Sequence, residues 1–217
     1  MTQAPLPGPI AVVVGLVALG VVVIDVGWRV IRHGMVMAHE GAHGVADAVA
    51  GRQVDHIELH RNASGETYPK KQGGCLAGVI AAFAGYIGPS LFGLGAAKLI
   101  QLGYTVAVLW ATLALLVLLL LRLRWSFGLI TVTLAGGLVY LIVRYIPVPT
   151  QTFAAYAIAW LLLLSGVRGI LASDPLKGDS QTLSQLTLIP RVFWILLWLA
   201  ATLTAVAVGG SWLVMRT

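Results

Sequence analysis

Charged residues and cysteines are what this 217-residue chain has least of. Only 10% of its residues are charged, whereas about a quarter are charged in an average soluble protein, and 59% are hydrophobic. Its mean hydropathy of +0.91 excludes an ordinary soluble domain. The single cysteine, Cys75, excludes an intramolecular disulfide framework and a metal cluster built only from cysteines. The formal net charge of +6 comes from basic residues scattered singly between apolar runs, so we expect no nucleic-acid partner.

Long apolar runs are what the chain does have, and they predict an all-α polytopic membrane protein in a lipid bilayer. A span needs about 20 mostly apolar residues, and in lipid its backbone groups must bond within the segment, which favours helices. Six segments meet or approach that length: 9–28, 75–100, 105–121, 125–145, 152–171 and 191–213. The first lacks the basic start of a cleavable signal peptide, so we expect a retained span, with a signal anchor as the alternative. Residues 1–217 are expected to form a single membrane-embedded domain.

The distribution of lysine and arginine predicts the orientation of these spans. If the N-terminus is outside and successive spans alternate, eleven of the 14 basic residues fall on the inner side; the outer side keeps Lys98, Arg144 and Arg216. The positive-inside rule then makes the inner side cytoplasmic and the membrane the cell (inner or plasma) membrane. Segment 33–50 leaves from the inner side and returns to it. We therefore expect a re-entrant or interfacial helix there, or a cytoplasmic extension of the first span.

Residues 36–47, VMAHEGAHGVAD, place several ionisable groups in this apolar chain. His39, Glu40 and His43 form the pattern HExxH, which on a helix puts two imidazoles one turn apart on one face, within reach of one Zn²⁺. Zinc lowers the pKa of water from about 16 to about 7, and Glu40 is placed to accept the proton and pass it to a leaving amine. The alternative is a polar helix face at the membrane surface. Ionisable groups at membrane depth are costly and commonly functional, which favours a metal site.

A catalytic zinc usually has three protein ligands, so one more is expected on the same side of the membrane. The candidates are Asp25, Asp47, His56, His60, Asp174 and Asp179. Asp47 is too close in sequence to the histidines to reach the same metal and fits better as a partner for an imidazole or for the base. Asp25 can pair with Arg29 one helical turn later.

The remaining candidates each have a simpler structural interpretation as well. His56 and His60 are spare ligands in principle, but they are better explained as members of a polar loop. Asp174 precedes a proline and is expected in an extended turn. Asp179 stands directly before the amphipathic run SQTLSQL and could be the N-cap of that helix.

Three stretches together resemble the bacterial membrane metalloproteases similar to the site-2 protease: HEGAH after a first span, AGYIGPSLFG at 84–93, and GDSQTLSQLT at 178–187. In that family two histidines and a distant aspartate hold zinc, and the glutamate is the general base. The resemblance therefore implies His39, His43 and Asp179 as zinc ligands and Glu40 as the base. Better-known members have L-D-G or N-P-D-G where this chain has K-G-D-S, so Asp174 is kept in reserve.

The resemblance implies a zinc-dependent intramembrane endopeptidase whose partner is a membrane-spanning or membrane-associated protein substrate. The alternative is a membrane protein that binds metal without proteolysis, such as a divalent-metal carrier or an inactive scaffold. Replacement of Glu40 separates the two, because only hydrolysis needs a base.

Two further segments bear on the site. Residues 54–69 alternate as strands do and contain the turn-prone run 62–65, so they predict a β-hairpin whose edge could pair with an extended substrate. Gly85, Gly88 and Pro89 are expected to interrupt a helix, either to allow close approach near the site or as an ordinary proline kink. Six tryptophans are expected as lipid-facing or interfacial anchors: Trp110, Trp125, Trp160, Trp194, Trp198 and Trp212.

Overall fold

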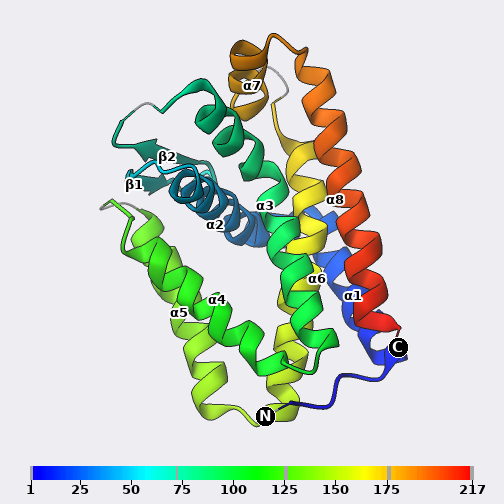
Figure 1. Ribbon diagram of the computed structural model, residues 1–217. Coiled ribbons are helices and arrows are strands. Elements are labelled where there is room, and N and C mark those ends of the chain that lie inside the picture. The colour runs from blue at the N-terminus through cyan, green and yellow to red at the C-terminus, as the bar shows by residue number, and fades with distance from the viewer. Residues whose placement is uncertain (1, 72, 125–126, 175–176, 216–217) are drawn as a thin grey trace.

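The computed structural model of the protein describes residues 2–71, 73–124, 127–174 and 177–215. Its elements, in chain order, are α1 (Gly8–Val23), α2 (Asp25–Val49), β1 (Val54–Leu59), β2 (Gly65–Pro69), α3 (Cys75–Gln101), α4 (Thr105–Leu120), α5 (Phe127–Tyr145), α6 (Val148–Ala172), α7 (Asp179–Thr187) and α8 (Arg191–Val214). Figure 1 shows a helical bundle with the hairpin and α7 toward one end and both chain termini at the other. The expected all-α fold with one small hairpin is confirmed.

Four helices in the described part of the chain are long and apolar enough to cross a membrane: α3, α5, α6 and α8. The pair α1 and α2 counts as a fifth only if the two helices form one broken span. The predicted span 105–121 is the 16-residue helix α4, which is apolar but short. The protein is therefore a multi-pass membrane protein with four or five candidate spans, and the predicted count of six holds only roughly.

The chain bends by 97° between α1 and α2. Ile24 is extended at the break (φ −75°, ψ 129°), and α2 begins at the next residue. Gly27 lets the two helices meet closely, because a Cβ there would collide with the carbonyl oxygen of Val21. The predicted boundary is thus wrong by several residues: the first span ends at Val23 instead of residue 28, and one continuous helix replaces the expected segment 33–50. Of the expected alternatives, the bend fits a re-entrant or interfacial helix and not a straight extension of the first span.

Contacts between distant segments define the two ends of the bundle. At one end, Ile57 of β1 donates its backbone N–H to the Arg122 carbonyl oxygen at 2.8 Å, and the Cys75 thiol lies 3.5 Å from the Leu186 carbonyl oxygen. At the other end, the Gln3 N–H meets the Gly103 carbonyl oxygen at 2.7 Å. The loops that carry most of the basic residues therefore share the end at which the hairpin and α7 lie (Figure 1).

Helix α3 runs through the middle of the bundle and packs on α2, α6 and α8. It is continuous through Pro89, so the predicted interruption is wrong. Its small residues instead permit close approach: Ser90 donates its hydroxyl to the Leu163 carbonyl oxygen of α6 at 3.2 Å, and Gly93 leaves no room for a Cβ beside Leu163. This close packing fixes α3, and with it one wall of the site described below.

Two of the tryptophans expected at the membrane interface are buried instead. Trp194 and Trp198 of α8 are 9% and 1% exposed. Trp198 donates its indole N–H to the Phe83 carbonyl oxygen at 3.0 Å, and its ring lies 4.6 Å from that of Tyr86. Trp110 is exposed as expected, and Trp125 lies outside the described residues.

The hairpin is confirmed, with β1 and β2 antiparallel and Leu59 paired with Gly65. The other edge of β1 is already occupied in part, because Ile57 bonds to Arg122 and Arg124 through its N–H and its carbonyl oxygen. Within the described strands, β2 pairs only with β1. The open edge of the hairpin is therefore that of β2.

Candidate metal centre

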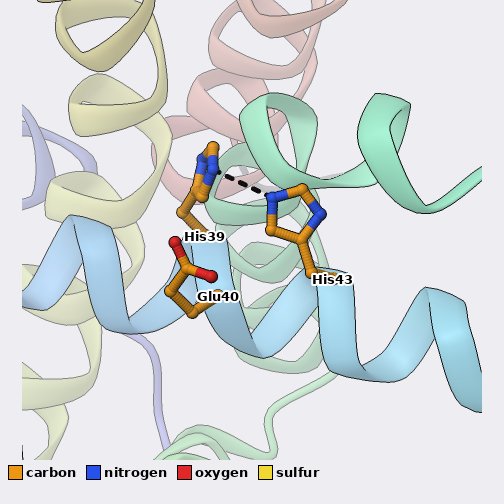
Figure 2. Close-up of side chains that lie close together, drawn as sticks. All are labelled: His39, Glu40 and His43. Carbon is orange, nitrogen blue, oxygen red and sulfur yellow. Dashed lines mark hydrogen bonds between the residues drawn. The ribbon is translucent and has the colours of Figure 1, made fainter. Parts of the chain in front are cut away.

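The HExxH segment lies in the middle of α2 and faces a cavity of about 990 Å³. The cavity is bordered by α2, the hairpin, the start of α3, the end of α6, and α7. His39 and His43 lie one helical turn apart, and Figure 2 shows their rings side by side with Glu40 on the same helix. The two histidines share one face of α2, as the helical spacing predicted, and Glu40 lines the same cavity.

Three donor atoms form a small triangle in this cavity. The Nε2 atoms of His39 and His43 are 3.1 Å apart. The Oδ2 atom of Asp179, at the start of α7, lies 3.2 Å from the first and 3.3 Å from the second. The ligand atoms of His39, Glu40 and His43 also lie within 4.8 Å of one another. The fold thus brings together residues from α2 and α7 that are far apart in the sequence.

The triangle has the size of one face of a tetrahedral metal site. Ligands bonded to Zn²⁺ at 2.0–2.1 Å in a tetrahedron are about 3.3–3.4 Å apart. Two imidazoles and a carboxylate are also a known donor set of catalytic zinc. Because these three lone-pair atoms face one another, a proton or a cation is needed between them to prevent repulsion. The residues present therefore fit a divalent metal ion such as zinc.

The charge of Asp179 suits this arrangement. Burial would by itself raise the pKa of this carboxyl, but the imidazoles of His43 and His39 hold that pKa below its ordinary value. The group is therefore an anion at neutral pH. An anionic oxygen against two imidazole nitrogens favours a cation in their midst.

Asp179 reaches the histidines because of how α7 begins. The N-cap of α7 is Gly178, whose φ of 71° and ψ of −146° suit glycine, and Asp179 is the first helical residue. The interpretation of Asp179 as the N-cap is therefore wrong. Asp174, the reserve candidate, pairs with Lys177 at 3.7 Å and has a 48% exposed side chain. The carboxylate that meets both imidazoles is that of Asp179.

Helix α3 holds the imidazoles from behind. The Nδ1–H of His43 donates to the Ala81 carbonyl oxygen at 2.8 Å, which leaves Nε2 facing the triangle. His39 lies edge-on to Tyr86, with ring centroids 4.7 Å apart. Its Nδ1 is buried and has no hydrogen-bond partner among the described residues, so ring packing orients this imidazole.

Two glycines of α3 explain how the helices come so close. A Cβ on Gly85 would collide with Nε2 of His43 and would lie 2.8 Å from Cε1 of His39. A Cβ on Gly88 would collide with that of Ala42. The glycines therefore allow the close approach beside the site that was one of the two expected roles of this segment. They do so within a continuous helix and not through a break in it.

Strand β2 contacts the carboxylate of Glu40. Thr67 donates its hydroxyl to Oε2 of Glu40 at 2.7 Å. A Cβ on Gly65 would lie 2.6 Å from Cγ and 2.8 Å from Oε1 of Glu40. Glu40 itself is 3% exposed. Its carboxylate is thus oriented by the hairpin, while the imidazoles are oriented by α3.

Two other aspartates that could have completed the triangle have partners elsewhere. Asp25 pairs with Arg168 of α6 at 3.0 Å, and not with Arg29 as expected. Asp47 is 2% exposed and pairs with Arg52 at 3.2 Å, so its partner is a guanidinium and not the imidazole or base expected. Both carboxylates therefore serve ion pairs between segments.

The two hairpin histidines also lie apart from the triangle. His56 hydrogen-bonds Asp55 at 2.8 Å and stacks on Tyr68, with ring centroids 4.6 Å apart. His60 is exposed at the turn, where its N–H bonds to the Ser64 carbonyl oxygen.

Several residues around the site were missed by sequence reasoning. Ala81 and Tyr86 both lie in α3, and the spacing of four residues between Ala81 and Gly85 could have placed Ala81 on the face of Gly85. Tyr86 directly follows Gly85, so helical spacing alone does not place it on that face. Thr67 and Gly65 carry no local signal, because their contact with Glu40 depends on how the hairpin folds back over α2. Only tertiary structure identifies them.

Comparison with known protein families identifies the family to which the chain belongs. A family model described as Peptidase M50B-like, that of the site-2 protease family, matches residues 12–209, which include all of the residues at the centre. Comparison with curated proteins and with solved structures found no match. The match covers most of the chain, from the first helix to the last. The protein belongs to the Peptidase M50B-like family of membrane metalloproteases.

Proposed function

We propose that this protein is a zinc-dependent endopeptidase that hydrolyses a peptide bond of a membrane-spanning or membrane-associated protein. The observation that carries the proposal is the convergence of the His39, His43 and Asp179 donor atoms within 3.1–3.3 Å of one another, with Glu40 beside them. Membership of a peptidase family supports it independently.

In this proposal His39, His43 and Asp179 hold the ion and Glu40 is the catalytic base. When bound, zinc supplies Lewis acidity, which allows water to lose a proton near neutral pH. Glu40 accepts that proton and transfers it to the nitrogen of the leaving amine, while the water oxygen ends in the new carboxylate. The hydroxyl of Thr67 orients the Glu40 carboxylate, and the small exposed fraction of Glu40 limits access of bulk water.

The substrate is expected to enter as an extended chain. A peptide bond within a helix is shielded by its own hydrogen bonds and side chains, so the substrate must unwind locally. Strand β2 borders the cavity, and its edge away from β1 pairs with no other strand among the described residues, so it can supply backbone hydrogen bonds to such a segment. Because the loops rich in basic residues lie at this end of the bundle, we place the site toward the cytoplasmic side of the cell membrane.

The test combines metal analysis with cleavage of an identified substrate. Glu40→Gln should retain zinc and abolish cleavage. Asp179→Asn should lose zinc, whereas Asp174→Asn, a matched change five positions earlier, should retain both zinc and activity. Cleavage that survives Glu40→Gln overturns the proposed mechanism. Metal binding or transport unaffected by Glu40→Gln, in a protein that cleaves nothing, would favour the metal-carrier or scaffold alternative.

A further inference from the structure

A second cavity, of about 910 Å³, lies on the face of α2 opposite the HExxH side chains. It is bordered by α2, α4, α5 and α6, with β1 across one end, and Met35 and Arg52 border both cavities. In Figure 1, α4 and α5 diverge from α6 toward the end that carries the hairpin. Nothing in the proposed hydrolysis uses this space.

Small residues on α2 explain why the space is not filled by the protein. Gly34, Ala38 and Gly41 recur at helical spacing and line the cavity. A Cβ on Gly34 or on Gly41 would have no atom within 4 Å. The cavity also opens outward, because Val45 and Leu118 on its rim are 47% and 60% exposed. In a membrane protein, an apolar opening between helices of the bundle faces lipid.

The walls offer no free polar group in the depth of the cavity. Its two hydroxyl residues are satisfied within their own helices: Thr112 bonds to the Val108 carbonyl oxygen at 2.8 Å and Ser165 to that of Leu162 at 3.3 Å. The remaining deep lining is aliphatic or aromatic. Along α4 and the turn after it, the lining runs from Thr112 to Arg122, roughly 15 Å at 1.5 Å per residue, which is about half of the 30 Å hydrocarbon core. The cavity thus has the depth of one leaflet.

The mouth of the cavity is basic. Lys70 and Arg122 line the mouth on either side of β1. The backbone N–H of Lys70 donates to the carbonyl oxygen of Gln53, just before β1, and the backbone N–H of Ile57 in β1 donates to the carbonyl oxygen of Arg122. Both side chains are exposed, and neither forms an ion pair with an acidic side chain in the part of the chain that the structure describes. Arg52, the third basic residue here, is already paired with Asp47. Two uncompensated cations therefore stand where an apolar cavity one leaflet deep meets the membrane surface.

We propose that this cavity binds one phospholipid with an anionic headgroup, its acyl chains between α2 and α4 and its phosphate at Lys70 and Arg122. Charge complementarity selects the headgroup, since basic side chains near the membrane surface attract anionic lipids. A transmembrane helix of a substrate is the competing occupant. The HExxH side chains lie on the far face of α2, so a chain lying in this cavity would be separated from them by the helix.

Native mass spectrometry of the full-length protein in detergent tests the proposal, with dioleoyl-phosphatidylglycerol and dioleoyl-phosphatidylcholine as probes. The wild type should bind the anionic lipid at least tenfold more tightly than the zwitterionic one. The double variant Lys70→Gln/Arg122→Gln should lose that preference, and its melting temperature should no longer rise with the anionic lipid. Lys71→Gln is the matched control, because it removes the same charge one residue away from a position that lines the cavity. Equal binding of the two lipids by the wild type, or an undiminished preference in the double variant, overturns the proposal.

A second measurement identifies the occupant in the membrane. A photoreactive amino acid in place of the exposed cavity residue Leu118 should crosslink to a phospholipid in intact cells. A crosslink that forms mainly to another protein would replace the lipid by a polypeptide and overturn the proposal. Gly34→Leu should reduce lipid crosslinking in the same experiment, because its side chain extends into the space where no atom lies within 4 Å of a Cβ.

Discussion

Replacing Gly85 of α3 with alanine tests whether the close approach of α3 is what holds the imidazoles. The added Cβ would collide with Nε2 of His43 and lie 2.8 Å from Cε1 of His39. Overpacking of this kind costs about 1–3 kcal/mol, whereas alanine is about 1 kcal/mol better than glycine inside a helix. We therefore expect a net loss of stability of no more than about 2 kcal/mol, and a much larger effect on the metal, because both rings must move to admit the methyl group.

Gly95→Ala is the matched control, since it lies in the same helix and its Cβ would meet nothing within 4 Å. The assay is zinc content after purification, with affinity from competition against a chelator, and unfolding followed by intrinsic fluorescence. Gly85→Ala should lower zinc affinity by about ten- to a hundredfold, the range seen when groups that orient metal ligands are disturbed. Gly95→Ala should bind zinc as the wild type does. Equal zinc affinity in the two variants would refute the reasoning that α3 positions the imidazoles.

Three further changes test the supports of the site. Thr67→Val removes a hydrogen bond to the charged Glu40 carboxylate, which is worth about 1.5–3 kcal/mol. The kcat measured in steady-state assays should therefore fall by about ten- to a hundredfold at unchanged zinc content, and Thr67→Ser should restore it. An unchanged kcat in Thr67→Val would contradict this. Asp47→Ala leaves the guanidinium of Arg52 largely buried without its partner and should lower the free energy of unfolding by about 3–5 kcal/mol, a loss that chemical denaturation measures. Trp198→Ala should lower the free energy of unfolding by about 3–5 kcal/mol, because the side chain is only 1% exposed. The control Phe193→Ala, at a 50% exposed position, should change the stability measured by thermal unfolding by less than about 1 kcal/mol.

The parts of the fold that follow from local pattern could be predicted from the sequence. The pair His39 and His43 needed only a helix to share a face, and the hairpin 54–69 needed only alternation around a turn. The break at Ile24 could not be predicted in this way. Isoleucine is no helix breaker, and the bend depends on Gly27 meeting the carbonyl oxygen of Val21.

The third member of the triangle was found on different grounds. The sequence offered six candidates and spacing argued against Asp47, and the resemblance to a family then selected Asp179 among the others. In the structure the selection depends on one backbone position: Gly178 takes the N-cap of α7 with a positive φ, so that the carboxylate of Asp179 turns inward to the imidazoles. The partners of Asp25 and Asp47 were mistaken for a related reason. Their arginines come from other segments or from beyond the helix end, and spacing along one helix does not reveal them.

The two halves of the proposed chemistry are held by different parts of the fold. The metal-facing atoms depend on α3 and α7, through the Ala81 carbonyl oxygen, Gly85 and the start of α7. The carboxylate of Glu40 depends on β2, through Thr67. Because β2 also has the open edge beside the cavity, a substrate strand that pairs with it would act on the same element that orients the base. Changes in the hairpin should therefore alter the rate of cleavage while zinc stays bound, whereas changes in α3 should remove zinc and cleavage together.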